Sequence, residues 1–418
     1  MSGEVNLTVS LNKDNVPVTG QPQLIYALLE IMPTEVMANV QMPLNFSLVL
    51  DTSGSMSGEK IQRLKDAVKY VIDQLGDDDI ISIIRFSSGA STLIGSQRVR
   101  TSDKQSLKRK VDQLDADGGT NMAPAMRTGL AEIQKEWSEN RINRMVLLTD
   151  GQTQGESDCL KMADEAGRKR IPIIALGIGT DWNEKLLQDI GTRSGGQADY
   201  IAKPQEIGQF FQSTVQAMQA AVVQNAVLTL RLVAGVTPRK VWRVVPIIAD
   251  LGYSPISDRA ITVPLGELEK GQGQALLVEL MLTGRQAGNY RIAQAEVAYD
   301  VPLLKLTQEK VRADIMLGFT LDPALAQRVN PRVMNIVEKV TAFKLQTRAL
   351  QEAEVGNVAG ATQKLRAAAT ILLSQGEADL ARTAQQEADR LEKQGQMTAE
   401  GKKTIQFKGS KTVRLDQP

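Results

Sequence analysis

The chain has 418 residues, of which 42% are hydrophobic and 23% charged, a composition typical of globular proteins. Its length suggests about two to four domains. Lysine and arginine number 49 against 48 acidic residues, so no bulk charge draws the chain to nucleic acid or to an anionic membrane. Histidine is absent, which removes the commonest general base and weighs against an enzyme.

Three features of the sequence bear on where the protein works. The single cysteine, Cys159, excludes an internal disulfide framework. The first residues, MSGEVNLTVS, lack the charged and then apolar pattern of a signal peptide. No apolar run reaches the roughly 20 residues that a membrane-spanning helix needs. We therefore expect a cytoplasmic protein without a membrane span.

Two short strands are predicted near the amino terminus, within residues 1–42. Apolar and polar residues alternate over Val5–Leu11, and a second apolar run covers Leu24–Ile31. Two strands alone are not stable, so these segments need partners from elsewhere in the chain.

Strands then alternate with helices over residues 43–222. The apolar run Leu44–Leu50 is followed by a helix with one apolar face and then by a second buried strand, Ile80–Phe86. This alternation predicts a doubly wound, Rossmann-like α/β domain with helices on both faces of its sheet. Its further strands are predicted at Ser91–Ile94, Met145–Thr149 and Ile171–Gly177, and its further helices at Lys104–Leu114, Ala123–Trp137, Cys159–Arg168, Asn183–Ile190 and Gln205–Ala221.

A period of two residues returns over residues 223–320 and predicts a β domain. We expect these strands and the two amino-terminal ones to form one antiparallel β-sandwich, with the α/β domain inserted between them, since this arrangement gives the early strands a core. A weaker alternative places the early strands at an edge of the α/β sheet. The strands are predicted at Leu228–Leu232, Val241–Val245, Ile261–Leu265, Ala275–Leu282, Ile292–Tyr299 and Val311–Leu317.

Helices dominate the carboxyl-terminal part of the chain, residues 323–396. The predicted helices Pro331–Ala353, Val358–Ser374 and Ala378–Gln394 are separated at Gly356 and Gly376, which suit helix ends. A three-helix bundle is the favoured interpretation, and a tetratricopeptide-like repeat is the alternative, because a solenoid usually needs several repeats. The remaining residues, 397–418, are rich in lysine and are expected to form a basic, solvated tail.

The end of the first α/β strand carries a candidate ligand-binding loop. Asp51, Ser53 and Ser55 follow the apolar run in the sequence DTSGS, and open α/β sheets bind ligands at the carboxyl ends of their strands. Three oxygen side chains at alternate positions suit a hard cation such as Mg²⁺. The alternative is a strand-to-helix turn in which Asp51 or Ser53 only caps the next helix.

Two later loops strengthen the metal-site hypothesis. Residues 117–121, DGGTN, lie between two predicted helices, and Asp150-Gly151 ends a buried strand. In a doubly wound sheet, the strands that end at Asp51 and Asp150 can be neighbours at the switch point, which brings their loops together.

This combination of motifs, spread over residues 44–221, resembles the von Willebrand factor A (VWA) family. The family's metal-ion-dependent adhesion site is written Asp-x-Ser-x-Ser, then Thr, then Asp. The resemblance implies that Asp51, Ser53, Ser55, Thr120 and Asp150 form a site for Mg²⁺, or for Mn²⁺ or Ca²⁺. It also implies a non-enzymatic module that binds a partner protein through the partner's acidic side chain. Cytoplasmic members often work beside an ATPase, a kinase or a phosphatase.

Two other functions stay open from the sequence. In a scaffold protein, the metal would be structural, and the β and helical domains would bind the partner. A metal-dependent phosphatase-like enzyme is a further alternative, since Asp51 follows a strand as an aspartyl nucleophile does. Ser53 stands where such phosphatases place a second acid, which disfavours the enzyme.

Overall fold

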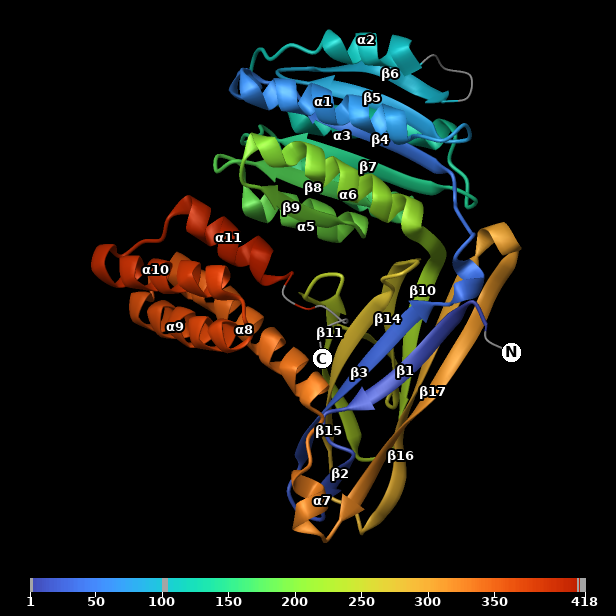
Figure 1. Cartoon of the computed structure of the whole chain (residues 1–418), viewed down its shortest axis with the longest axis vertical. Coiled ribbons are helices and arrows are strands. Elements are labelled where there is room, and N and C mark those ends of the chain that lie inside the picture. The colour runs from blue at the N-terminus through green and yellow to red at the C-terminus, as the bar shows by residue number, and fades with distance from the viewer. Residues whose placement is uncertain (1–2, 100–103, 412, 414–418) are drawn as a thin grey trace. The chain divides into compact units, whose positions relative to one another are not determined.

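The computed structural model of the protein describes residues 3–99, 104–411 and 413 (Figure 1). The chain divides into two compact units. One comprises Gln41–Ala221, and the other joins Met1–Val40 to Val222–Pro418. In the part of the chain that the structure describes, no helix is both long enough and apolar enough to cross a membrane.

The sheet of the first unit has six strands in the order β6-β5-β4-β7-β8-β9. Neighbouring strands are parallel except for β6, which pairs antiparallel with β5. The central strand β4 is buried along its whole length, including its polar residues Asn45, Ser47 and Asp51, as expected of a parallel strand that is covered on both faces. Sequential strands add to one side of β4 and then, from β7, to the other, so the switch point lies between β4 and β7. The bounds are β4 (Leu44–Asp51), β5 (Ile80–Phe86), β6 (Ala90–Arg98), β7 (Ile142–Thr149), β8 (Ile173–Ile178) and β9 (Gln197–Ile201).

Helices cover both faces of this sheet (Figure 1). Because successive side chains of a strand point to opposite faces, Leu48 joins the core shared with α1, α2 and α6, whereas Val49 faces α3. A Cβ atom at Gly129 of α3 would lie 2.7 Å from the Val49 side chain, so the close approach of α3 to β4 requires glycine. The bounds are α1 (Glu59–Gln74), α2 (Lys104–Asp112), α3 (Met122–Lys135), α4 (Glu156–Arg168), α5 (Glu184–Ser194) and α6 (Ile207–Ala220).

The second unit contains a β-sandwich made of two sheets, in the orders β1-β3-β15-β11-β12 and β13-β14-β10-β16-β17-β2. The amino-terminal strand β3 pairs with β15, so the α/β domain is inserted between strands of one sandwich. The alternative with the early strands at the edge of the α/β sheet is wrong, because β1 and β3 pair within the sandwich. The bounds are β1 (Val5–Leu11), β2 (Asn15–Pro17), β3 (Gln23–Pro33), β10 (Ala221–Leu232), β11 (Val236–Val245), β12 (Ala249–Asp250), β13 (Ser254–Ser257), β14 (Ala260–Glu269), β15 (Gln274–Leu282), β16 (Gly288–Val301) and β17 (Leu306–Thr320).

The first half of α8 packs on the outer face of the sheet that contains β3, β11 and β15. Val333 and Val340 of this helix share an apolar cluster with Leu28, Trp242 and Leu277. Its second half packs against α9 and α11. The bounds are α7 (Pro323–Gln327), α8 (Pro331–Glu354), α9 (Val358–Ser374), α10 (Ala378–Gln394) and α11 (Ala399–Gly409).

The prediction of a basic, solvated tail over residues 397–418 is wrong for the segment that ends at residue 411, and residues 412 and 414–418 lie outside the described residues. Residues Ala399–Gly409 form helix α11, which Thr398 caps by accepting a hydrogen bond from the Gly401 N–H. Ile405 and Phe407 are buried in the helical domain, and even the Lys403 side chain is fully buried. Lysines dominate the composition of this segment, although the helix face that packs against the domain is apolar. The composition alone therefore predicted a solvated segment.

Candidate metal centre

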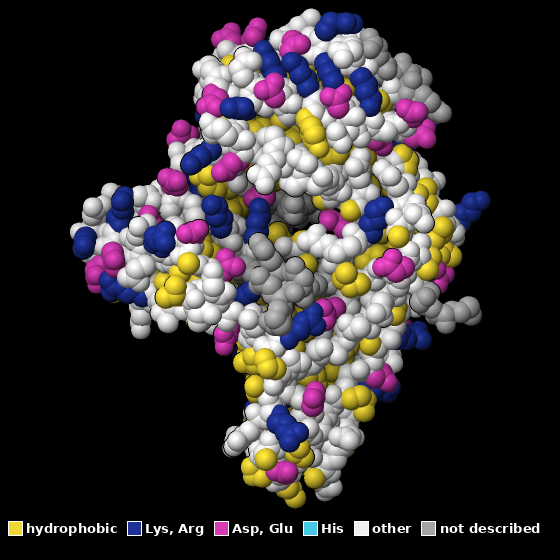
Figure 2. Space-filling view, in the orientation of Figure 1, with side chains coloured by type: hydrophobic (Ala, Val, Ile, Leu, Met, Phe, Trp, Pro, Cys, Tyr) yellow, Lys and Arg dark blue, Asp and Glu magenta, His cyan; other side chains and the backbone are white. Residues whose placement is uncertain are grey.

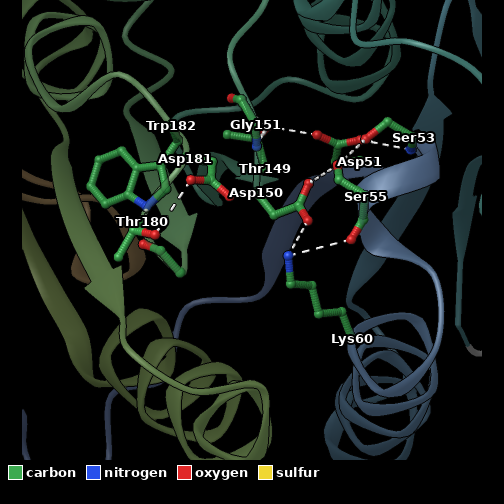
Figure 3. A network of polar contacts seen from close by, with 11 residues as sticks. Asp51, Ser53, Ser55, Lys60, Thr149, Asp150, Gly151, Thr180, Asp181 and Trp182 are labelled. Atoms are coloured by element: carbon green, nitrogen blue, oxygen red, sulfur yellow. Dashed lines mark hydrogen bonds and ion pairs between the residues drawn. The ribbon is translucent and has the colours of Figure 1, made fainter. Parts of the chain in front are cut away.

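The candidate site lies at the carboxyl ends of β4 and β7, the neighbouring parallel strands at the switch point (Figure 3). Asp51 is the last residue of β4, and Asp150 follows the last residue of β7. The short 3-10 helix η2 (Gly54–Met56) then carries the chain from β4 toward α1. The sheet therefore brings together two loops that are almost 100 residues apart in the sequence.

A chain of hydrogen bonds links the polar side chains of these two loops (Figure 3). The Thr149 hydroxyl donates to Asp51 Oδ2 at 2.6 Å, and the Ser53 backbone N–H donates to Asp51 Oδ1 at 2.8 Å. The Ser53 and Ser55 hydroxyls lie 3.1 Å apart, and the Ser55 hydroxyl donates to Asp150 Oδ1 at 2.6 Å. Four of the five predicted residues thus form one connected network.

The fifth predicted residue, Thr120, comes from the loop between α2 and α3. Backbone hydrogen bonds fix this loop against the first one: the Gly54 N–H donates to the Gly118 carbonyl at 3.0 Å. A Cβ atom built on Gly151 would lie 3.6 Å from Thr120 Oγ1 and 3.8 Å from Ser55 Oγ. The Thr120 and Ser55 hydroxyls therefore converge on the same point, beside Asp150.

The carboxylates of the site are buried and only partly neutralised. Asp51 and Asp150 are shielded from solvent. Burial raises the pKa of the Asp51 carboxyl, hydrogen bonds from Ser53 and Thr149 lower it in part, and the Asp150 carboxylate raises it further. One ammonium compensates, because Lys60 Nζ lies 2.5 Å from Asp150 Oδ2.

The donor set suits a hard divalent cation. Within residues 3–99, 104–411 and 413, no group of three or more His, Cys, Asp or Glu side chains could hold a metal ion. The oxygen donors that accompany the two carboxylates at this site are the hydroxyls of Ser53, Ser55 and Thr120. In an octahedral Mg²⁺ complex with oxygens at about 2.1 Å, adjacent ligand oxygens lie about 3 Å apart. The 3.1 Å between the Ser53 and Ser55 hydroxyls matches this spacing.

Sequence reasoning missed two residues of this network, Thr149 and Lys60. Thr149 precedes the predicted Asp150, and a hydroxyl at the end of a buried strand was a signal for a partner to Asp51. Lys60 is only five residues beyond Ser55, near the amino terminus of α1, where a cation opposes the helix dipole. A lysine in this unfavourable position indicates that a specific anionic group pairs with it, and this was the available signal for Lys60.

Comparison with known proteins supports the assignment of the fold. The model of the von Willebrand factor type A domain matches residues 45–213. The protein sll0103 of Synechocystis, named as uncharacterized, is 31% identical over 340 residues, which cover 79% of this chain and 78% of that protein. The chain belongs to the von Willebrand factor type A domain family. Members of this VWA family typically mediate protein interactions.

Further similarities extend beyond the VWA domain. Residues 331–416 match the model of the Sll0103-like carboxyl-terminal α-helical domain. A solved VWA-type structure from Catenulispora acidiphila has a TM-score of 0.80 at 19% identity, and the match covers 98% of this chain and 97% of that one. YfbK of Escherichia coli is 25% identical over 254 residues, 58% of this chain but only 42% of that relative. The predicted fold class, a VWA α/β domain with a sandwich and a helical domain, is therefore confirmed.

Proposed function

We propose that this VWA protein is a non-enzymatic module that binds a partner protein through a divalent cation, Mg²⁺ or alternatively Mn²⁺ or Ca²⁺. The observation that carries the proposal is the convergence of two buried carboxylates and three hydroxyls at the switch point between β4 and β7. The set contains only oxygen donors, which hard cations prefer.

The residues divide into two roles. The hydroxyls of Ser53 and Ser55 would hold the ion directly, and the Thr120 hydroxyl would join them when the partner binds. Asp51 and Asp150 would hold the water molecules of the ion and orient the hydroxyls. Neutral ligands close to the ion leave it electron-poor, so it attracts a carboxylate from outside. The partner proposed here is accordingly a protein with an exposed acidic side chain, and an ATPase, a kinase or a phosphatase is the class that the family resemblance suggests.

We favour binding over catalysis on chemical grounds. Asp51 Oδ2 accepts a hydrogen bond from Thr149, and Oδ1 accepts one from the Ser53 N–H, so both oxygens of the would-be nucleophile are engaged. Ser53 occupies the place of a general acid, and its hydroxyl pairs with the neutral Ser55 hydroxyl. Neither arrangement activates a nucleophile.

Two substitutions test the metal-bridge mechanism. Asp51→Ala should abolish both Mg²⁺ binding and Mg²⁺-dependent partner capture, because it removes the carboxylate that orients the loop. Thr120→Ala should weaken capture more than it weakens binding of the free ion, because this hydroxyl would become a direct ligand only when the partner binds. The expected scale of these losses is about ten- to a hundredfold. The measurements are Mg²⁺ titration calorimetry and affinity capture in Mg²⁺ and in chelator, with mass spectrometry to identify the difference.

The matched control is Thr128→Ala, which removes a hydroxyl that donates to the Pro124 carbonyl within α3. This variant should bind Mg²⁺ and partner as the wild type does. Capture that survives chelator, or that persists in a folded Asp51→Ala variant, would contradict the bridge and favour a scaffold with a structural metal.

A further inference from the structure

Lys60 is held inside the candidate metal centre, although it stands in the first turn of a helix. Its ammonium lies 2.5 Å from Asp150 Oδ2 and 3.3 Å from the Ser55 carbonyl oxygen (Figure 3). The amino terminus of a helix carries partial positive charge, so a lysine there is unfavourable unless another group compensates. The buried Asp150 carboxylate supplies that compensation.

The hydrogen bonds of Asp150 leave neither of its oxygens without a donor. Oδ1 accepts from the Ser55 hydroxyl, and Oδ2 accepts from Lys60. The same carboxylate is the one that would hold water on a bound cation. A divalent ion and the Lys60 ammonium therefore compete for one negatively charged group.

We propose that Lys60 is a built-in competing cation, which stabilises the metal-free centre and lowers its affinity for divalent ions. This inference rests on the proposed metal-binding function and adds a mechanism that regulates the same site. A buried carboxylate left without a partner is costly, so the ammonium keeps the empty loop folded. Since the two cations exclude each other, a higher concentration of free divalent ion is needed to fill the centre.

Lysine is well suited to this role. Its ammonium is a compact charge on a flexible four-carbon stem, so it can leave Asp150 without a shift of α1. The Lys60 side chain keeps 27% of its surface exposed, which gives it a route to solvent once an ion displaces it.

A second lysine on α1 provides a matched control. Lys69 forms an ion pair with Asp112 of α2, and 30% of its side chain is exposed, close to the value for Lys60. Its partner is 55% exposed. Neutralising Lys69 removes the same charge from the same helix without changing the metal centre.

The test is Mg²⁺ and Mn²⁺ titration calorimetry on the full chain. Lys60→Met should raise the affinity for both ions by about tenfold, within the usual range of coupling between two ligands. Lys60→Gln, a neutral variant that still donates a hydrogen bond, should also bind more tightly, and Lys69→Met should match the wild type. In chelator the melting temperature of Lys60→Met should fall below that of the wild type, and saturating Mg²⁺ should raise it by more than it raises the wild type.

The outcomes separate this inference from the function on which it rests. Wild-type protein that binds Mg²⁺ while both neutral variants bind no more tightly would overturn the competing-cation role and leave the metal centre standing. Partner capture that falls in Lys60→Met at unchanged Mg²⁺ affinity would also overturn it, because Lys60 would then contact the partner. Wild type and Asp51→Ala that both fail to bind divalent ions would overturn the proposed function itself.

Discussion

Two buried carboxylates in this protein each pair with a lysine, yet their surroundings differ. The Asp150 side chain is fully buried and the Glu279 side chain is 10% exposed, and their lysines, Lys60 and Lys344, are both 27% exposed. Glu279 lies on β15 and pairs with Lys344 of α8, in the second unit. Asp150 lies in the first unit, at the switch point of the α/β sheet.

The neighbours of each pair explain the difference. Glu279 also accepts a hydrogen bond from the Trp242 indole at 3.0 Å, and the Lys344 ammonium lies over the Trp242 ring, 4.8 Å from its centre. Both charges there have favourable partners, and the cluster joins α8 to the sandwich. Asp150 has a second carboxylate and hydroxyls around it, so negative charge remains (Figure 3). The other groups around the carboxylate therefore decide whether a lysine–carboxylate ion pair stabilises the fold or competes with a ligand.

The largest expected effect concerns stability at the Glu279 cluster. Trp242→Ala should lower the free energy of unfolding by about 3–5 kcal/mol, because it leaves a cavity under α8 and removes partners of Glu279 and Lys344. Calorimetric melting measures the loss, and Mg²⁺ titration should show unchanged affinity. Trp137→Ala, at an exposed tryptophan, is the control and should melt near the wild type. A weakened Mg²⁺ affinity in Trp242→Ala would break the distinction between the two clusters.

A paired exchange of acids sharpens the comparison directly. Glu279→Gln should destabilise the protein by about 1–3 kcal/mol and leave Mg²⁺ affinity unchanged, since Lys344 loses its buried counter-charge. Asp150→Asn should instead lower Mg²⁺ affinity by about ten- to a hundredfold. Its loss of stability should be smaller than that of Glu279→Gln, because the variant also removes the repulsion between the Asp150 and Asp51 carboxylates, which offsets the lost pair with Lys60. Urea unfolding and titration calorimetry on both variants measure the four quantities. A loss of Mg²⁺ affinity in Glu279→Gln, or a larger loss of stability in Asp150→Asn than in Glu279→Gln, would contradict this assignment of a structural role to Glu279 and a metal-binding role to Asp150.

The smallest expected effect is a pH dependence at Asp51. Burial raises the pKa of this carboxyl, so its ionisation destabilises the folded, metal-free protein. The protonated Asp51 carboxyl contributes favourably to the free energy of unfolding. This contribution is complete below the pKa of the unfolded state, about 3.9, and is lost as pH rises through the raised pKa of the folded state. In chelator, the stability of Asp51→Asn relative to the wild type should therefore rise with pH, as measured by urea unfolding. In saturating Mg²⁺ the wild type should be the more stable protein. A difference that does not vary with pH would contradict this.

Most elements could be predicted where a periodic apolar pattern was long enough. The strand Val5–Leu11 and the helices Val358–Ser374 and Ala378–Gln394 have the predicted bounds. Strands β9 and β13 were missed: β9 (Gln197–Ile201) has no run of apolar residues, and β13 (Ser254–Ser257) is exposed throughout. Such strands form because a neighbouring strand offers hydrogen bonds, which a local pattern does not reveal.

The candidate site was predictable to a different extent. Its oxygen side chains follow strand ends in the sequence, and the doubly wound topology brings them together, so spacing was enough to nominate them. Lys60 was not nominated, because its role depends on a contact with Asp150, which is 90 residues away in the sequence. The buried Lys403 of α11 was missed for a related reason, since burial of a lysine is set by tertiary packing.

The insertion of the α/β domain has a consequence for how the chain folds during synthesis. β3 ends at Pro33 and its partner β15 begins at Gln274, so about 240 residues separate them. At about 5–20 residues per second, the ribosome needs roughly 12–50 seconds to make that stretch. The β1–β3 hairpin, unstable alone, waits for this time while the α/β domain emerges complete. The first sheet of the sandwich therefore closes only after β15 has left the ribosome.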